Sequence, residues 1–318
     1  MKITVVGPGR WGSFIAWYLD SIGHRVTLYG RRESEKMQEF NLRRKNDYVE
    51  LPLSLELSTN LNSLLEAKVI IISVNAQGLR RFFEEIESLE IKNKIFVLCM
   101  KGIEISTGKR LSEIAEECLD PSNKVAVWLG PGHPQEFVKG IPNCMVIDSN
   151  DEATKNLLVN EFGSNLIRFY YGTDLLGNEI GGAAKNVVGI AAGILDGLGL
   201  STLKGALMSR APREYSRLVE AMGGNVLSVY GLCHLGDYEA TVFSQYSNNR
   251  RFGENFAKGE SFYKLAEGCH TVKALKQLGR QYDVDLPITN AIDDILYHDT
   301  DPKTTLEQLF TRSQKKEF

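Results

Sequence analysis

Short apolar runs alternate with longer amphipathic or polar stretches along the first half of the chain. The apolar runs are rich in β-branched residues and cover positions 2–6, 25–29, 69–74, 95–99, 125–129 and 144–147. Strands that alternate with helices in this way predict a parallel sheet that is covered on both faces. The pattern therefore predicts a doubly wound α/β domain, which we place at residues 1–176.

The hydrophobic pattern changes after residue 171, where β-branched runs give way to helical periodicity. Helices are predicted at 180–195, 203–222, 249–258, 264–282 and 289–296. Pro212 falls inside the second of these, and proline removes a helical hydrogen bond, so we expect it to kink or split that helix. Residues 177–318 are thus predicted to form an all-helical domain, with a frayed tail at 313–318.

The predicted helix at 180–195 is apolar and rich in Gly and Ala, and its strongly polar side chains are Lys185 and its neighbour Asn186. Such a helix is expected to be buried. A buried ammonium group needs a partner, and burial moves its pKa toward neutral pH. A catalytic lysine fits this pattern. So does a structural lysine that reaches the surface or pairs with a carboxylate.

A partner for Lys185 is not predicted within its own helix. Asp196 is the acidic residue on the same face, and it lies about 16 Å away along the helix axis. Asp237, which follows Gly236, is the best candidate from elsewhere in the sequence.

Length and composition limit the class of protein. The 318 residues suffice for two domains, and 43% hydrophobic and 24% charged residues are ordinary for a globular protein. A net charge of -3 argues against a general nucleic-acid binder, and the apolar runs are too short to insert into a membrane. Five scattered cysteines indicate neither disulfides nor a metal site. We expect a cytoplasmic protein.

A glycine-rich run, Gly7-Pro-Gly-Arg-Trp-Gly12, lies between the first predicted strand and a predicted helix. In a strand-helix-strand unit this spacing is the dinucleotide fingerprint of Rossmann domains. Gly7 permits the tight turn, Gly9 lets the backbone approach a pyrophosphate, and Gly12 lets the helix pack on the strand. The alternative is an ordinary glycine turn in a doubly wound sheet.

The end of the second predicted strand bears on the choice of nucleotide. NAD-specific sites usually place Asp or Glu there, whereas this chain has Gly30-Arg31-Arg32. Two guanidinium groups suit a 2′-phosphate, so we expect NADP to be accepted as well as NAD. Alternatively, both arginines are solvated and Arg31 stacks on the adenine.

Further motifs follow the glycine run in a fixed order along nearly the whole chain. They are Leu28-Tyr-Gly-Arg31, Lys101-Gly102, Gly130-Pro131, Gly181-Gly-Ala-Ala-Lys-Asn-Val187, Ala192-Gly-Ile-Leu-Asp-Gly-Leu-Gly199, Gly236-Asp237, Asn249-Arg-Arg-Phe-Gly253 and Ala266-Glu-Gly268. With these motifs the chain resembles the NAD(P)-dependent glycerol-3-phosphate dehydrogenases of the bacterial type.

The resemblance implies an oxidoreductase that interconverts sn-glycerol 3-phosphate and dihydroxyacetone phosphate and supplies precursors of glycerophospholipids. It implies that Lys185 is the catalytic acid/base, with Asp237 beside it and Lys101 at the substrate. The other implied substrate contacts are Gly130, Asn186, Thr241, Ser247 and Asn249. Besides the three glycines, the nucleotide contacts would be Arg10, Trp11, Arg31, Arg32, Lys101, Pro134, Asn248 and Glu267. A homodimer with a small phosphorylated substrate as its ligand is expected.

The chain departs from the family pattern at two loops and in the segment between Gly259 and Glu267, which is some two helical turns shorter than is usual. The motif Ser-Arg-Asn-Arg-Arg-Phe-Gly reads Ser247-Asn-Asn-Arg-Arg-Phe-Gly253, so Asn248 replaces the arginine that reaches phosphate. The loop Gly-Pro-Ser/Thr-x-Ala reads Gly130-Pro-Gly-His-Pro134, which places glycine at position 132. These departures keep two alternatives open, a dehydrogenase acting on another phosphorylated polyol or ketose, and a non-catalytic NAD(P)-binding sensor.

Overall fold

The computed structural model describes residues 1–311, which fold into two compact units. The first unit comprises Met1–Lys101 and Lys109–Glu179, and the second comprises Gly102–Gly108 and the chain from Ile180 onward. The short segment 102–108 thus belongs to the second unit, although the first surrounds it in sequence. A domain boundary after residue 176 stays a prediction, and the expected frayed tail lies outside the described residues.

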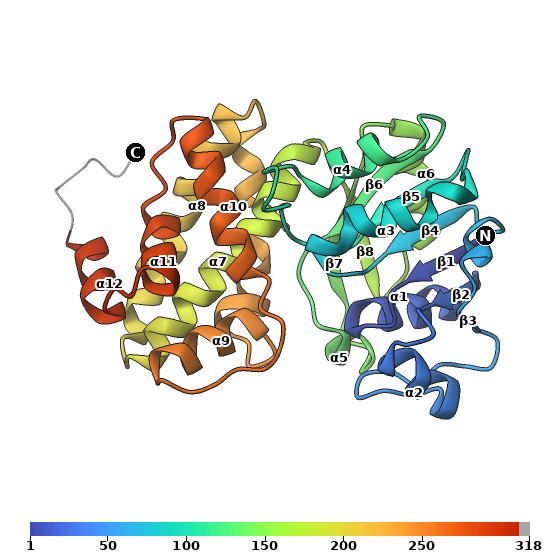
Figure 1. Cartoon of the computed structure of the whole chain (residues 1–318), viewed down its shortest axis with the longest axis horizontal. Helices are drawn as coiled ribbons and strands as arrows, with labels where there is room; N and C mark the ends of the chain where they lie inside the picture. Colours follow the sequence, from blue (N-terminus) through green and yellow to red (C-terminus); the bar gives the residue numbers. More distant parts are fainter. Residues whose placement is uncertain (312–318) are drawn as a thin grey trace. The chain divides into compact units, whose positions relative to one another are not determined.

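The first unit is built on one eight-stranded sheet in the order β3-β2-β1-β4-β5-β6-β7-β8 (Figure 1). Neighbouring strands pair in parallel, except that β7 runs antiparallel to β6. The strands are β1 (Lys2–Val6), β2 (Arg25–Tyr29), β3 (Glu56–Ser58), β4 (Val69–Ile72), β5 (Ile95–Leu98), β6 (Lys124–Leu129), β7 (Asn143–Asp148) and β8 (Ile167–Tyr171).

Helices connect these strands and cover the sheet. Every residue of β4 and β5 is buried, as expected for strands with helices on both faces. The helices of this unit are α1 (Arg10–Ser21), α2 (Glu35–Arg43), α3 (Leu79–Ile86), α4 (Leu111–Cys118), α5 (Pro134–Phe137) and α6 (Glu152–Phe162). The predicted α/β fold class is confirmed.

The strand order reverses beside β1, because β2 lies on one side of β1 and β4 on the other. Open α/β sheets bind ligands beyond the carboxyl ends of the strands at such a switch point. Gly7 follows β1 directly, and Ser73 follows β4. Lys101 and Gly130 come after the parallel strands β5 and β6, at the same edge of the sheet.

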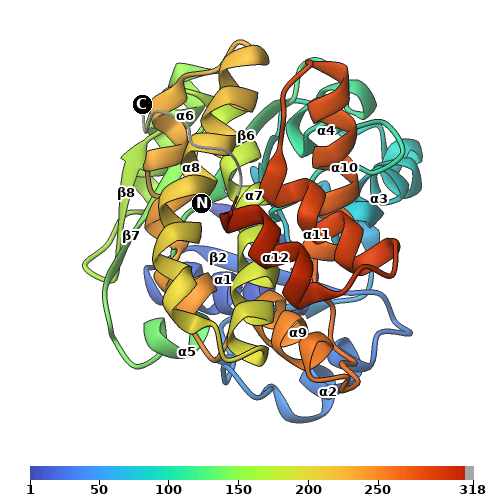
Figure 2. The same cartoon turned by 90° about the vertical axis from the view of Figure 1, so that its left-hand side faces the viewer.

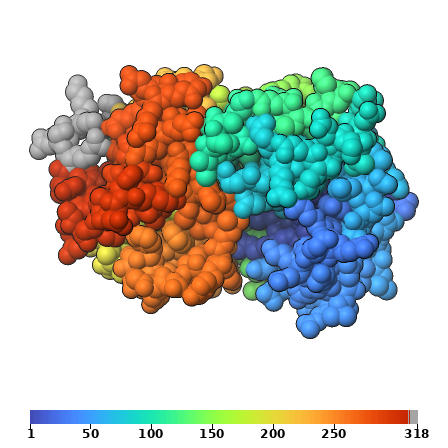
Figure 3. Space-filling view, in the orientation of Figure 1, coloured from blue at the N-terminus to red at the C-terminus, as the bar shows by residue number. Residues whose placement is uncertain are grey.

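The second unit is helical. Helix α7 (Leu175–Gly197) starts in the last residues of the first unit, and the later helices enclose it (Figures 1 and 2). All residues from 180 to 195 are buried, as predicted. The orange and red segments form the face of this unit that Figure 3 shows. The later helices are α8 (Lys204–Ala221), α9 (Asn248–Ala257), α10 (Gly268–Gln281), α11 (Pro287–Tyr297) and α12 (Pro302–Phe310).

Several local predictions need correction. Helix α8 continues through Pro212 as one element, so Pro212 does not split it, whereas the expected kink stays a prediction; Pro212 is buried. Residues 264–267 are not helical, and α10 begins only at Gly268, whose N–H donates to the Asn249 side chain. Strand β7 runs antiparallel to β6, and the connection between them contains only the four-residue helix α5 in place of the longer helix of a usual parallel crossover. Strands β3 and β8 and helix α12 were not predicted.

Candidate active site

Lys185 and Asp237 form an ion pair inside the helical unit. The Lys185 Nζ atom lies 2.7 Å from the Asp237 Oδ2 atom. Only 8% of Lys185 and 1% of Asp237 are exposed. The expected partner of Lys185 is therefore confirmed, and the lysine does not reach into open solvent. A buried, hydrogen-bonded ammonium next to a carboxylate is an arrangement that can hold and release a proton.

Asp237 and Thr241 approach Lys185 from one irregular stretch of chain. Asp237 ends the 3₁₀ helix η6 (Leu235–Asp237), and Thr241 lies in the π-helical turn η7 (Glu239–Phe243). The Lys185 ammonium donates a hydrogen bond of 2.8 Å to the Thr241 hydroxyl. Short 3₁₀ and π segments are frequent at functional sites because they aim side chains that a regular helix would direct elsewhere.

A chain of amide contacts lies beside this pair. Asn249 Nδ2 donates to the side-chain oxygen of Asn186 at 3.0 Å, and the N–H of Gly268 donates to Asn249 Oδ1 at 2.9 Å. Glu267 directly precedes α10, and the Ser247 hydroxyl caps the N-terminus of α9. The structure thus brings together all the predicted site residues of this unit in two adjoining groups, at the Lys185 turn of α7 and at the start of α9.

Small residues on α7 and α9 explain this juxtaposition. A β-carbon at Gly193 would clash with the carbonyl oxygen of Arg250, and one at Gly253 would clash with that of Ile190. The two helix backbones therefore touch directly. This contact brings Asn249 to Asn186, so the Gly and Ala content read from the sequence sets the geometry of the site.

The two arginines that follow Asn248 have contacts of their own in this structure. Asn248 Nδ2 donates to the carbonyl oxygen of Leu265 at 3.1 Å. The Arg250 guanidinium is paired with Asp196, with Nε 2.7 Å from Oδ2. The guanidinium carbon of Arg251 lies over the Phe262 ring, 5.8 Å from its centroid. Arg250 is thus committed to a structural ion pair and is not a solvated helix-surface residue.

The glycine turn of the first unit has the backbone that a dinucleotide requires. Gly7 has a φ of 106°, and a β-carbon there would clash with the carbonyl oxygen of Ser73. A β-carbon at Gly12 would clash with the carbonyl oxygen of Gly7. Among the described residues, no side chain caps the N-terminus of α1 at Gly9, and its first turn carries no acid. The first amides of α1 are therefore suited to a pyrophosphate.

Arg10 and Trp11 join this turn to the loop after β6. Arg10 Nη2 lies 3.0 Å from His133 Nδ1, and the Trp11 ring packs edge-on against Phe137 in α5. Pro134 opens α5 at its first position. A β-carbon at position 132 would clash with the Phe137 ring, which explains why this loop departs from the family pattern and has glycine there.

Arg31 and Arg32 differ in their surroundings, which the sequence did not predict. The Arg31 Nη2 atom donates to both carboxylate oxygens of Glu85 in α3, at 2.6 and 2.7 Å. Arg32 is exposed. The Lys36 Nζ atom lies 3.9 Å from where a β-carbon of Gly9 would be, so an ammonium group stands next to the glycine turn. Lys36 lies two positions after Ser34, the N-cap of α2. A basic residue at the start of the helix after the second strand is the feature of the sequence that could have pointed to this contact.

Lys101 contacts the loop after β6. Its ammonium donates to the Gly130 carbonyl oxygen at 2.7 Å, and Gly130 has a φ of 127°. The structure therefore brings together these two predicted substrate residues at the carboxyl edge of the sheet.

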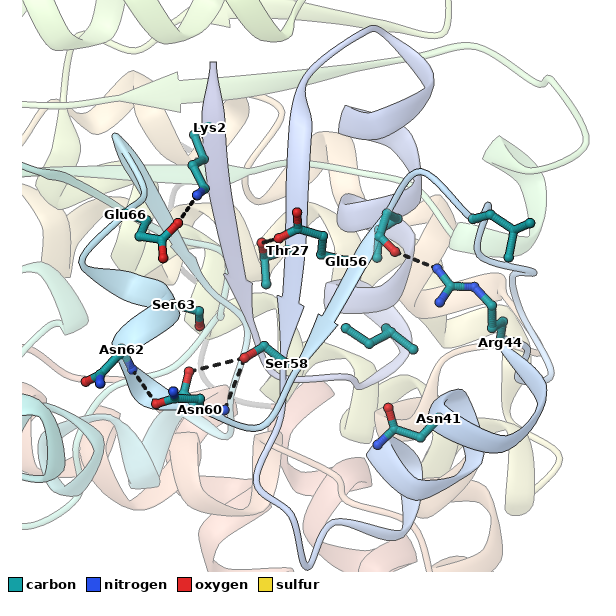
Figure 4. Close-up of a pocket in the computed structure, with 13 residues that line it drawn as sticks. Lys2, Thr27, Asn41, Arg44, Glu56, Ser58, Asn60, Asn62, Ser63 and Glu66 are labelled. Carbon is teal, nitrogen blue, oxygen red and sulfur yellow. Dashed lines mark hydrogen bonds and ion pairs between the residues drawn. The ribbon is translucent and has the colours of Figure 1, made fainter.

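A cavity of about 590 Å³ lies elsewhere in the first unit, next to β3 (Figure 4). Its charged side chains are already engaged: Lys2 pairs with Glu66, and Arg44 Nη2 donates to the carbonyl oxygen of Leu55. Neither the glycine turn nor Lys101 lines it. We therefore do not assign the cavity to the nucleotide or the substrate.

Comparisons with known proteins agree with this geometry. The family model of the NAD-dependent glycerol-3-phosphate dehydrogenase N-terminus matches residues 2–155, and that of the C-terminus matches residues 174–307. Glycerol-3-phosphate dehydrogenases named for NAD(P)+ from a Thermoanaerobacter species and from Pelodictyon phaeoclathratiforme are 35% and 36% identical over the whole chain and 99% of each relative.

Among solved structures, the glycerol-3-phosphate dehydrogenase of Coxiella burnetii is similar, with a TM-score of 0.92 and 27% identity over 98% of this chain and 99% of that one. None of the described helices is long and apolar enough to cross a membrane. The full-length matches confirm the resemblance and, with it, a nicotinamide cofactor. The chain belongs to the NAD-dependent glycerol-3-phosphate dehydrogenase family.

Proposed function

We propose that the protein interconverts sn-glycerol 3-phosphate and dihydroxyacetone phosphate with NAD(H) or NADP(H). The observation that carries the proposal is the buried Lys185–Asp237 ion pair in the helical unit. Reduction of a ketone needs a proton at the carbonyl oxygen, and Lys185 is the proton donor in this mechanism. In the reverse reaction the same nitrogen takes the proton from the hydroxyl group.

Asp237 and Thr241 prepare Lys185 for this role. The carboxylate of Asp237 favours the ammonium form, and the Thr241 hydroxyl accepts a second hydrogen bond from the same nitrogen. These two acceptors fix the position of the Lys185 ammonium group. Holding a proton donor in position in advance lowers the barrier to its transfer.

The glycine turn is the centre of nucleotide binding in this proposal. Gly7, Gly9 and Gly12 with the first amides of α1 bind the pyrophosphate, and Arg10 and Trp11 flank it. When bound, the nicotinamide nucleotide supplies or accepts the hydride. The residues proposed for the remainder of the nucleotide are Arg31, Arg32, Lys101, Pro134, Asn248 and Glu267.

Two groups of residues are proposed as substrate contacts. Lys101, held by the Gly130 carbonyl, is a cation at the carboxyl edge of the sheet and can polarise the substrate carbonyl or hold its phosphate. Asn186 and Asn249, fixed to each other, offer amide groups to the hydroxyls and the phosphate. Ser247 completes the set at the start of α9.

A second candidate is a dehydrogenase of the same family that acts on another phosphorylated polyol or ketose. It is favoured by Asn248, which donates to the Leu265 carbonyl while Arg250 is committed to Asp196. With asparagine at position 248, the start of α9 offers a substrate phosphate one cation fewer than the family pattern does. A non-catalytic NAD(P)-binding sensor would have no need of a buried lysine and carboxylate pair, so we rank it last.

The test is a substrate panel. Oxidation of NADH and of NADPH is followed by absorbance with dihydroxyacetone phosphate and with other ketose phosphates. The proposal expects the highest kcat/KM with dihydroxyacetone phosphate, and a higher value with another ketose phosphate would favour the second candidate. No oxidation with any of them would favour the sensor. A cytoplasmic homodimer that feeds glycerophospholipid synthesis is part of the proposal and rests on the family resemblance.

A further inference from the structure

His234 lies behind the Lys185–Asp237 pair and is completely buried. Its Nδ1 atom is 2.8 Å from the carbonyl oxygen of Gly181, and its Nε2 atom is 2.6 Å from the Tyr238 hydroxyl. A carbonyl can only accept, so Nδ1 carries the proton, and Nε2 accepts the hydrogen bond from Tyr238. Both ring nitrogens are therefore used, each in a fixed role.

The first of these bonds reaches the helical turn that carries the lysine. Gly181 precedes Lys185 by four positions in α7, so its carbonyl oxygen also accepts the backbone N–H of Lys185. A β-carbon at Gly181 would lie 3.0 Å from the His234 β-carbon, so glycine lets the histidine approach this close. The imidazole is thus hydrogen-bonded to the backbone of α7 one turn before Lys185.

The histidine is also connected to the other two members of the site. The N–H of Asp237 donates to the His234 carbonyl oxygen at 3.0 Å, and the N–H of Thr241 donates to the Tyr238 carbonyl oxygen at 3.0 Å. The backbone of His234 therefore starts the turn that presents Asp237, and its ring fixes the residue from which the Thr241 turn begins.

Charge does not disturb this arrangement. Burial lowers the pKa of His234 to about 4, and the nearby Lys185 ammonium acts in the same direction. The imidazole is therefore neutral near pH 7 and does not compete with Lys185 for the Asp237 carboxylate. The Tyr215 ring packs edge-on against it, with centroids 5.3 Å apart.

We infer that His234 is a positioning residue. Its hydrogen bond to Gly181 ties the turn that carries Asp237 and Thr241 to the Lys185 turn of α7, and so fixes the position of the Lys185 ammonium group. The inference rests on the proposed function. It concerns kcat, because the groups it orients act on the reacting carbonyl, and it leaves nucleotide binding to the first unit untouched.

Two amide substitutions separate the two ring bonds. His234→Asn places an N–H near the position of Nδ1 and keeps the bond to Gly181, whereas His234→Gln places its amide near Nε2 and loses that bond. Tyr215→Phe is the matched control, because it removes a buried hydroxyl from the same cluster that bonds Thr289 instead. We measure kcat and KM for dihydroxyacetone phosphate, the Kd of NADH and the thermal unfolding midpoint on the full-length protein.

We expect kcat to fall at least tenfold in His234→Gln and to stay within about threefold of wild type in His234→Asn, on the order of 1.4 kcal/mol for each tenfold step. KM and the NADH Kd should change little in both. Equal kcat values for the two variants, or a kcat loss in Tyr215→Phe that matches that of His234→Gln, would overturn the inference. Lys185→Ala is run alongside: if it stays active, the proposed function fails, whichever result His234 gives.

Discussion

The ammonium nitrogen of Lys185 lies 2.7 Å from a carboxylate oxygen of Asp237, within a core of Gly, Ala and aliphatic side chains. Removing two charges from water costs about as much free energy as their attraction returns, so a buried ion pair contributes little to net stability. Its presence in the most apolar helix of the chain is better explained by chemistry than by folding.

Glu85 is predicted to limit binding of the 2′-phosphate of NADP, because its carboxylate occupies both hydrogen bonds of the Arg31 Nη2 atom. Glu85→Gln should free that guanidinium and remove a negative charge. We expect the Kd of NADPH to fall severalfold while that of NADH changes little, as measured by fluorescence titration. The exposed neighbour Glu84→Gln is the control. An equal gain for both nucleotides would mean that Arg31 does not discriminate between them.

Asn248→Arg should restore the guanidinium that the family places at the start of α9. If dihydroxyacetone phosphate is the substrate, KM should fall by roughly tenfold for each 1.4 kcal/mol of recovered interaction. Steady-state kinetics checks this, with Asn255→Arg on the same helix as the control for added charge. An unchanged or higher KM would favour a different natural substrate.

Glu214 is predicted to make stability depend on pH. Burial raises the pKa of its carboxyl from 4.5 to about 7, although the N–H groups of Ile288 and Thr289 donate to it. Between these two values the folded state binds more protons than the unfolded state. The contribution of Glu214 to the free energy of unfolding is therefore greatest below pH 4.5. It decreases by at most about 3 kcal/mol as the pH rises to 7.

The buried His234 has the opposite slope, because its lowered pKa favours folding as the pH rises from about 4 to 6.5. The comparison is therefore the difference in unfolding free energy between wild type and Glu214→Gln, followed by urea denaturation. The unfolding free energy of wild type minus that of Glu214→Gln should decrease as the pH rises from 4.5 to 7. The exposed Glu220→Gln on the same helix should show no such trend, and a parallel trend in both variants would refute the assignment to Glu214.

The sequence predicted the fold where the signal is local. The glycine run after β1 indicates a tight turn with backbone that favours glycine, and the small residues of α7 indicate a buried helix. Both features could therefore be predicted from the sequence. Strand β3 has three residues at the sheet edge, too short for a periodic signal. The continuity of α8 through Pro212 depends on packing from other helices, which local propensity does not report.

The sequence was enough to name candidate site residues, but not their contacts. Motif order named Lys185, Asp237 and Asn249, and the structure places them in adjoining groups. The pairing of Arg31 with Glu85 and the contacts of His234 could not be read, because they join residues distant in sequence that belong to no motif. Asn248 was recognised as a departure, yet only the structure shows that Arg250 is already bound to Asp196.

The most direct measurement is single-turnover oxidation of NADH by Lys185→Ala at saturating dihydroxyacetone phosphate, together with the Kd of NADH. If Lys185 delivers the proton, the rate should fall by about 10² to 10⁴ while the Kd stays at its wild-type value, because the glycine turn is unchanged. A variant that retained more than half of the wild-type rate would contradict the account.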